Sequence, residues 1–340
     1  MGLSKARLPG RWLGLGYIGG RLSLSEKALI EAIRRRAKPH SSVRLGIGDD
    51  CSVLRIPAGH EALVTTDFSL EGVHFRRDWH PPEVIGHRCL ARGLSDIAAM
   101  GGIPLAAFLS LALPTDLKSQ WVKRFVSGLL SLAARFNLTL AGGDTAQSRA
   151  GVLADIVVVG SVPKGKAIVR SGARPGDKIY ATGKLGAAAA TLDLLRSGRR
   201  LRPADYPAHF TPTPRVAIGQ YLRRAGLASA MIDISDGLSV DLGHICDESG
   251  VGAEILAAAI PPAGIGKRAS NVDLRYALHG GDDYELLFTA AAAKKIPSRI
   301  AGVPVTMIGN IVPGKRMFLL SVDGTRKILE PQGWQHFRKG

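Results

Sequence analysis

Two carboxylates in the first third of the chain stand where local structure alone does not explain them. Asp67 ends the apolar run from Leu63 to Thr66, which is typical of a short strand. Asp96 lies near the end of a segment with helical periodicity that runs from about Val84 to Ile97. A strand end and a helix end can converge, so we expect one site that binds metal ions and a polyanion. The alternative is a helical ion pair of Asp96 with Arg92, four residues earlier, worth roughly a few tenths of a kcal/mol.

Acidic residues recur in short segments that also contain Gly, Ser or Thr. The segments are GIGDD, TTD, LSD, GGDT and IDISDG, and most of them end a predicted strand or helix. Any one of them is easily explained as a turn. Together they offer carboxylates and hydroxyls on a glycine-rich frame, which are hard oxygen ligands suited to Mg²⁺. Because Mg²⁺ completes its shell with water and phosphates, the pattern predicts a site for nucleotide phosphates.

The segment Met231–Leu238 contains one acid that local structure explains and one that it does not. We expect Ser235 to be the N-cap of the following helix, with Asp236 in the first turn, where the helix N-terminus favours negative charge. Asp233 instead interrupts an apolar strand. Burial of a carboxylate there is costly unless it meets a cation or hydrogen-bond donors. Asp233 is therefore the stronger candidate for a metal ligand.

No familiar ATP-binding motif is complete in this sequence. The nearest approach to a Walker A motif runs from Gly160 to Ala167, but Ala167 replaces the Mg²⁺-binding Ser or Thr and Pro163 lies within the loop. The glycine-rich loop, HRD and DFG motifs of protein kinases are absent as well. An enzyme of this sequence that transfers phosphoryl groups must therefore use another fold.

The order of predicted elements indicates a mixed α/β protein of two domains, which suits a chain of 340 residues. Residues 1–22 form a basic, glycine-rich tail, residues 23–164 a first domain and residues 165–340 a second. The boundary falls in a stretch rich in Pro and Gly. We expect strands over 62–66, 105–113, 138–141, 152–160, 178–182 and 231–234, and helices over 84–97, 120–136 and 185–195.

Charge and composition narrow the classes of partner. Lys and Arg number 45 against 28 Asp and Glu, a net charge of +17. The basic residues are scattered in small groups without interleaved aromatic residues, so a surface that attracts phosphorylated small molecules is favoured over a nucleic-acid interface. The three cysteines fit neither a metal motif nor a disulfide framework, which favours a reducing cytoplasm. No apolar run reaches the ~18 residues of a membrane span.

Seven motifs taken in order resemble the thiamine-monophosphate kinase family. They are GIGDDCSVL, TTDFSLEGVHF, LARGLSDIAAMGGIP, AGGDT, VRSGARPGDKIYATG, IDISDGLSVDLGHIC and GGDDYELLFT, and the resemblance covers about Ser25 to Phe337. That family is similar in fold to the aminoimidazole ribonucleotide synthetase superfamily, which binds ATP without a P-loop. The resemblance implies an N-terminal α/β domain whose strands form a barrel across a homodimer, and a second α/β domain packed against it.

The resemblance also implies an activity and the residues that carry it. The activity is ATP-dependent phosphorylation of thiamine monophosphate to thiamine diphosphate with several Mg²⁺ ions. The implied metal ligands are Asp50, Thr65, Thr66, Asp67, Asp96, Asp144, Asp233 and Asp236. The implied ATP contacts are Gly143, Asp144, Arg170 and Ser235, and the implied substrate contacts are His74, Asp282 and Trp334. At Asp282 the family commonly has Glu, so the charge is kept but the reach is shorter.

The expected reaction needs no catalytic base. The acceptor is a phosphate monoester whose second pKa is ~6, so it is already an ionised nucleophile near neutral pH. We expect direct in-line transfer without a phosphoenzyme, with Mg²⁺ and Arg screening the repulsion between two polyanions. The alternatives are another ATP-dependent enzyme of the same superfamily and a basic nucleic-acid-binding protein with idle acidic loops. His74 alone is also consistent with an ordinary core residue, and Trp334 with a packing anchor rather than a cation-π partner.

Overall fold

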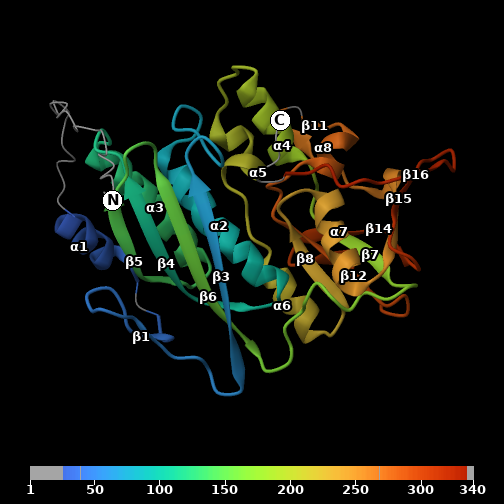
Figure 1. Ribbon diagram of the computed structural model, residues 1–340, viewed down its shortest axis with the longest axis horizontal. Coiled ribbons are helices and arrows are strands. Elements are labelled where there is room, and N and C mark those ends of the chain that lie inside the picture. Colours follow the sequence, from blue (N-terminus) through green and yellow to red (C-terminus); the bar gives the residue numbers. More distant parts are fainter. Residues whose placement is uncertain (1–25, 39, 268, 335–340) are drawn as a thin grey trace, which may run out of the picture.

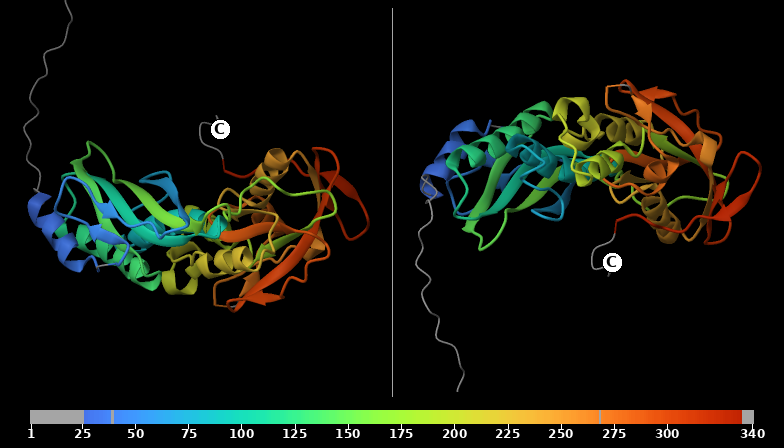
Figure 2. Two further views of the ribbon diagram at one scale, coloured as in Figure 1. Left: turned by 90° about the horizontal axis from the view of Figure 1, so that it is seen from below. Right: turned by 90° about the horizontal axis from the view of Figure 1, so that it is seen from above.

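The computed structural model describes residues 26–334 except residues 39 and 268 (Figure 1). The predicted tail, residues 1–22, lies outside the described residues. The fold is mixed α/β with two domains side by side, each built on its own sheet, as Figure 2 also shows. No helix of the described part combines the length and the apolar character that crossing a membrane requires.

A four-stranded sheet of order β3-β6-β4-β5 forms the centre of the N-terminal domain. The strands are β3 (His60–Leu70), β4 (Ile103–Leu113), β5 (Thr139–Gln147) and β6 (Leu153–Pro163). β4 and β5 are parallel, and the other pairs are antiparallel. Helices α2 (Pro82–Ala99) and α3 (Ser119–Arg135) cover one face. Helix α1 (Glu26–Arg36) and the hairpin of β1 (Val43–Leu45) and β2 (Val53–Leu54) lie near β5 (Figure 1).

The other face of this sheet is open in the single chain. Alternate residues of a strand point to opposite faces, so Leu63 is buried under the helices while Val64 is 68% exposed and Phe68 is 54% exposed. β3 is also an edge strand. An exposed edge strand with large apolar side chains is a surface that proteins normally cover.

Glycine lets α2 and α3 approach each other closely. A Cβ atom on Gly128 of α3 would lie 1.8 Å from the carbonyl oxygen of Glu83, and one on Gly86 of α2 would lie 2.0 Å from that of Phe125. No side chain fits at such distances. This contact fixes α2 against α3 and so fixes the helix that carries Asp96.

The C-terminal domain is built on an eight-stranded sheet of order β16-β15-β9-β14-β7-β12-β8, with β13 paired to β14. Only β9 and β15 are parallel among these pairs. The strands are β7 (Lys178–Thr182), β8 (Ala230–Ile234), β9 (Gly252–Leu256), β12 (Glu285–Ala290), β13 (Arg299–Ile300), β14 (Val303–Val312), β15 (Met317–Leu320) and β16 (Arg326–Ile328). A separate hairpin pairs β10 (Gly264–Ile265) with β11 (Ser270–Asn271).

Five helices accompany this sheet among the described residues. They are α4 (Ala187–Arg196), α5 (Pro207–Phe210), α6 (Val216–Arg224), α7 (Leu238–Ser249) and α8 (Leu274–His279). Helix α6 packs directly on α2, since a Cβ atom on Gly219 would lie 1.9 Å from the carbonyl oxygen of Ala98. α2 therefore lies between the two sheets and belongs to the core of the domain interface (Figure 1).

The predicted mixed α/β class is confirmed, and the strand predicted over 178–182 has the bounds of β7. Two details are wrong. Asp67 lies inside β3 and not at its end, because the alternation continues to Leu70. The Gly142–Thr145 segment lies inside β5 and not in a loop after it. Gly143 has a φ of 147°, and its missing Cβ would lie 1.9 Å from the carbonyl oxygen of Leu109, so glycine allows a close parallel pairing here.

Candidate active site

Three carboxylates from three elements lie together where the domains meet. Asp67 comes from β3, Asp96 from α2 and Asp233 from β8. The hydroxyl of Thr65 donates a hydrogen bond to Oδ2 of Asp96, and Oγ of Ser95 donates to Oδ2 of Asp233 at 2.7 Å. These two bonds join α2 to β3 on one side and to β8 on the other. The carboxylates therefore hold a fixed place relative to one another.

Burial disfavours the fully ionised form of these three carboxylates. Burial raises the pKa of Asp96 to about 7, and the charge of Asp233 adds to the rise. Burial likewise raises the pKa of Asp233 to about 6, against the hydrogen bond from Ser95. The pKa of Asp67 is also raised by burial, and Arg92 opposes that rise. A cation in this group would relieve the repulsion and complete its charge balance.

Arg170, on the segment between the two sheets, acts on the same group. Its positive charge lowers the pKa of Asp96 and of Asp233, although burial outweighs it in both cases. The structure therefore brings this predicted ATP contact within electrostatic range of two predicted metal ligands. A guanidinium at this point suits a phosphate bound beside the carboxylates.

The loop of Ser235 and Asp236 is held by a residue that sequence reasoning missed. Ser235 is not an N-cap: the N-cap of α7 is Gly237, with no side-chain capping bond. Instead Oδ2 of Asp241 accepts the backbone N–H groups of Ser235 at 3.1 Å, Asp236 at 3.2 Å and Gly237 at 3.0 Å. Asp241 stands on the buried face of α7 with Leu238, Leu242 and Ile245. An acid at helical spacing among apolar residues was the signal in the sequence that could have identified it.

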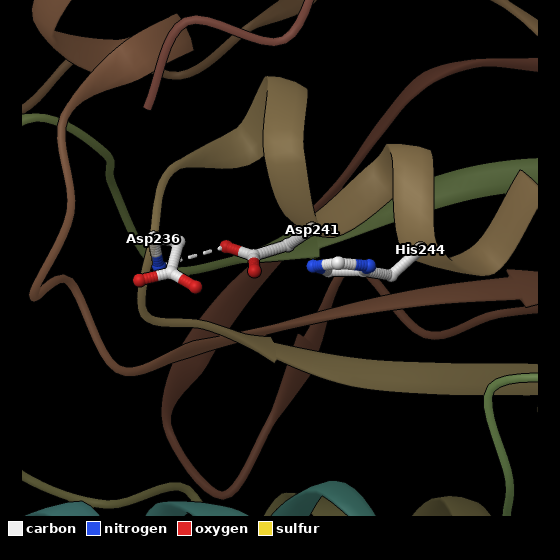
Figure 3. A group of neighbouring side chains, drawn as sticks. All are labelled: Asp236, Asp241 and His244. Carbon is white, nitrogen blue, oxygen red and sulfur yellow. Dashed lines mark hydrogen bonds between the residues drawn. The ribbon is translucent and has the colours of Figure 1, made fainter. Parts of the chain in front are cut away.

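Figure 3 shows Asp241 between Asp236 and His244. One possible ligand atom from each of the three lies within 4.8 Å of the others. Burial raises the pKa of Asp241 well above its usual range, and the charges of Asp233 and Asp236 add to this. Because one oxygen of Asp241 already accepts three N–H groups, we assign this residue to holding the loop and not to binding a metal.

Asp282 is enclosed by partners from both domains. Nη2 of Arg88 donates to its Oδ2 at 2.8 Å, the Tyr284 hydroxyl donates to its Oδ1 at 2.6 Å, and Nη1 of Arg92 lies 3.7 Å from Oδ1. Burial alone would raise the pKa of Asp282, but the charges of Arg88 and Arg92 hold it well below its usual range. Asp282 and Tyr284 both have positive φ, 66° and 51°. These partners maintain a tight, charged loop at the domain interface.

His74 lies beside the same arginines. It follows β3, and its Nδ1 accepts the backbone N–H of Leu70 at 3.0 Å. It lines a cavity of about 10 Å³ together with Ser69, Phe75, Ile85, Arg88 and Arg92. The structure therefore brings His74 and Asp282 into one neighbourhood. Trp334 lies at the Asp236 loop, where its backbone N–H donates to the carbonyl oxygen of Asp236 at 3.1 Å and the residue is 46% exposed.

The remaining predicted residues lie in two other places. Thr66 points away from α2 and donates to Oδ1 of Asp155 at 2.8 Å. Pairing across the sheet places Asp155 opposite Ser110 and Ser110 opposite Asp144, so these residues share the open face. Asp155 was missed, although the alternation of β6 could have marked it.

Asp50, Gly143 and Asp144 line a cavity of about 640 Å³ between α1, the β1–β2 loop and strands β4 and β5. The predicted ligands thus divide between the domain interface, the open face of the sheet and this cavity. A single chain brings Asp67, Asp96 and Asp233 together with the Asp236 loop, but it does not bring Asp50 to them.

Both halves of the chain match known families. Residues 48–162 match the family model of AIR synthase related protein, N-terminal domain, and residues 174–320 match that of the C-terminal domain. The fold therefore defines a protein of the AIR synthase related class. A crystal structure of hydrogenase maturation protein HypE in complex with ATP shares this fold, with a TM-score of 0.75 and 18% identity over 92% of this chain and 96% of that one.

Within this class, the chain belongs to the thiamine-monophosphate kinase family. It is 39% identical over 306 residues to thiamine-monophosphate kinase of Escherichia coli K12, covering 87% of this chain and 92% of the relative. It is 35% identical over 327 residues to that of Bacillus subtilis 168, covering 93% and 100%.

Solved structures of thiamine-monophosphate kinases are similar to this chain in fold and sequence. The crystal structure of thiamine-monophosphate kinase from Stenotrophomonas maltophilia K279a has a TM-score of 0.76 and 36% identity, covering 89% of this chain and 98% of that one. AaThiL complexed with AMPPCP and TMP has a TM-score of 0.73 and 32% identity, covering 92% and 97%.

Asp96→Asn is expected to stabilise the metal-free protein near pH 8 and to have a much smaller effect near pH 4. The folded pKa of about 7 lies above the ordinary 3.8. The folded state therefore binds the proton more tightly, and stability falls as the pH rises from about 4 to about 7. In EDTA we expect a gain on the order of 1 kcal/mol at the higher pH, measured by thermal unfolding. The exposed Asp116→Asn is the control, and a gain independent of pH would contradict the assignment.

Asp241→Ala is expected to lower the free energy of unfolding by roughly 1–3 kcal/mol, because three backbone N–H groups lose their acceptor. Asp241→Asn keeps an acceptor oxygen and should lose less. Urea unfolding measures both, with the exposed Asp247→Ala on the same helix as the matched control. Equal stability of Asp241→Ala and Asp247→Ala would show that the carboxylate does not hold the loop.

Proposed function

We propose that this protein transfers the γ-phosphoryl group of ATP to thiamine monophosphate, giving thiamine diphosphate and ADP. The observation that carries the proposal is the group of three buried carboxylates, Asp67, Asp96 and Asp233, at the domain interface of a chain of this family. Each comes from a different element, and their pKa values are raised. Such a group is built to receive cations that accompany phosphates.

The chemistry of the acceptor explains why the site needs charge more than it needs a base. A phosphate monoester loses its second proton near pH ~6, so the attacking oxygen is already ionised. The barrier then lies in bringing two polyanions together in line, and positioning supplies most of the catalysis. Transfer is direct, from ATP to thiamine monophosphate, without a phosphorylated side chain of the enzyme.

The donor set fits Mg²⁺. Arg92 meets Asp67 at Oδ1, through a hydrogen bond from Nε and an ion pair with Nη2, and within the described part of the chain Oδ2 of Asp67 accepts no hydrogen bond. Asp67, Asp96 and Asp233 would hold Mg²⁺ by carboxylate oxygens, which this ion prefers. The further proposed ligands are Asp50, Thr65, Thr66, Asp144 and Asp236. When bound, the ions would neutralise the phosphates and orient them for transfer.

The protein's own residues hold the two substrates. Arg170, Gly143, Asp144 and Ser235 are the proposed ATP contacts, with the Ser235 loop fixed by Asp241. His74, Asp282 and Trp334 are the proposed residues of the substrate side. Both oxygens of Asp282 already accept hydrogen bonds from protein groups, so Asp282 acts there by holding Arg88 and Tyr284 in place.

A second copy of the chain is the proposed partner of the open sheet face. Val64 and Phe68 expose apolar side chains on an edge strand, and a homodimer that extends this sheet into a barrel would cover them. The proposed location is the cytoplasm, because the three cysteines are free thiols. Neither a nucleic acid nor a membrane is a proposed partner.

A product assay tests the activity. Purified protein with ATP and Mg²⁺ is expected to form thiamine diphosphate and ADP in equal amounts from thiamine monophosphate, and little product from unphosphorylated thiamine.

Asp233→Asn should lower kcat by at least about 100-fold while the fold is kept, because the phosphates are then no longer held in line for transfer. The exposed Asp247→Asn is the control. Folded protein that binds ATP but forms no thiamine diphosphate would rule out the proposal. Tight, salt-sensitive RNA binding that survives Asp67→Asn would favour the nucleic-acid alternative.

Phe68→Asp is expected to convert the dimer to a monomer, because a charge at the centre of an apolar interface is not matched by a partner. Sedimentation velocity measures the change in mass. Val322→Asp is the control, because Val322 is 88% exposed on the C-terminal domain. A wild-type protein that sediments as a monomer at micromolar concentration would contradict the dimer.

A further inference from the structure

One side chain, Arg92, reaches acidic groups of both domains. It stands on α2, and its Nε and Nη2 lie 2.9 Å and 2.8 Å from Oδ1 of Asp67. Its Nη1 donates to the Tyr284 hydroxyl at 3.3 Å and lies 3.7 Å from Oδ1 of Asp282. The side chain of Arg92 is 17% exposed. The guanidinium therefore bridges the interface from a mostly buried position.

The planar shape of the guanidinium gives this bridge a fixed geometry. Nε donates a hydrogen bond to Oδ1 of Asp67 and Nη2 makes an ion pair with the same oxygen, so one edge of the guanidinium restricts the rotamer of that carboxylate. The third nitrogen is turned toward the Asp282 loop. A Lys side chain has one flexible charged group and cannot make both sets of contacts. The orientation of Asp67 therefore depends on where the C-terminal domain holds its loop.

That loop is in turn tied to the strand of Asp233. The backbone N–H of Asp282 donates to the carbonyl oxygen of Ser235, and that of Tyr284 donates to the carbonyl oxygen of Ile234, both at 2.8 Å. Strands β12 and β8 continue the pairing, with Leu286 opposite Asp233. A continuous set of contacts thus runs from Asp67 through Arg92 to the backbone that carries Asp233.

We propose that Arg92 is a positioning residue that sets the placement of Asp67 relative to Asp233 across the domain interface. The inference rests on the proposed phosphoryl transfer, because in-line transfer is sensitive to misplacements of ~1 Å, which lower rates by about 100-fold. Arg92 acts through the two carboxylates and does not itself contact the transferred group. The alternative is that Arg92 is only an ion pair that stabilises the interface.

Three variants and a control separate these roles. Arg92→Met keeps the length of the side chain and removes the bridge, Arg92→Lys keeps the charge, and Tyr284→Phe removes one contact of the bridge. Arg124→Met is the matched control, because Arg124 makes an exposed ion pair with Glu83 at 2.8 Å. Thermal unfolding of each variant establishes that it is folded at the assay temperature.

Arg92→Met is expected to lower kcat by about 100-fold, with the KM for ATP within about threefold of wild type. Arg92→Lys should lower kcat by about 10-fold, because it keeps the positive charge but not the planar guanidinium. Arg124→Met should leave kcat unchanged. If Arg92→Met lowers Tm while kcat stays within threefold of wild type, the residue is structural only and the proposal is wrong. If Arg92→Met does not fold, the same criterion applies to Arg92→Lys and Tyr284→Phe: a kcat within threefold of wild type in both variants would overturn the proposal.

Hydrogen exchange gives a readout that does not depend on catalysis. Loss of the bridge should increase the exchange of the amides of Asp282 and Tyr284 in Arg92→Met, by about 10-fold, and not in Arg124→Met. Unchanged exchange at these amides would overturn the proposal. If wild-type protein makes no thiamine diphosphate, the proposed function fails, and the exchange experiment still tests the bridge.

Discussion

The structure depends on burying three carboxylates, Asp67, Asp96 and Asp233, in one domain interface. Such groups lose the stabilisation that water gives to charge, and they repel one another, which is why their pKa values are raised. Positive charge near these groups offsets the repulsion. Arg92 and Arg170 supply part of it from the protein. The remaining deficit is what suits the site to metal ions and to the phosphates that accompany them.

Helix α2 connects this constraint to the fold. Arg88, Arg92, Ser95 and Asp96 lie along one stripe of the helix, which faces β3 and the C-terminal domain. The glycine contacts with α3 and α6 fix the helix on its other sides. A residue on α2 can therefore contact both domains at once, because the helix lies between the two sheets (Figure 1).

Sequence patterns predicted most elements and singled out the three acids that lie together at the domain interface, because apolar periodicity and misplaced carboxylates are local signals. They failed where a contact between residues far apart in the sequence determines the local structure. The alternative considered for Asp96 was an ion pair with Arg92 on the same helix, but Arg92 pairs instead with Asp67 and with Asp282, which lies 190 positions later in the chain. Asp241 replaces Ser235 as the group that organises the α7 N-terminus. Glycines at 142 and 143 looked like a turn, yet they permit a close strand pairing that only the neighbouring strand explains.

The most direct test of this account is a titration with Mn²⁺, a paramagnetic substitute for Mg²⁺, followed by electron paramagnetic resonance with and without an unreactive ATP analogue. The account predicts that wild-type protein binds Mn²⁺ more tightly when the analogue is present, because carboxylates and phosphates share the ion. Asp233→Asn should weaken this binding by at least about 10-fold while keeping its fold. Equal Mn²⁺ affinity of the two proteins would contradict the claim that the buried carboxylates form the metal site.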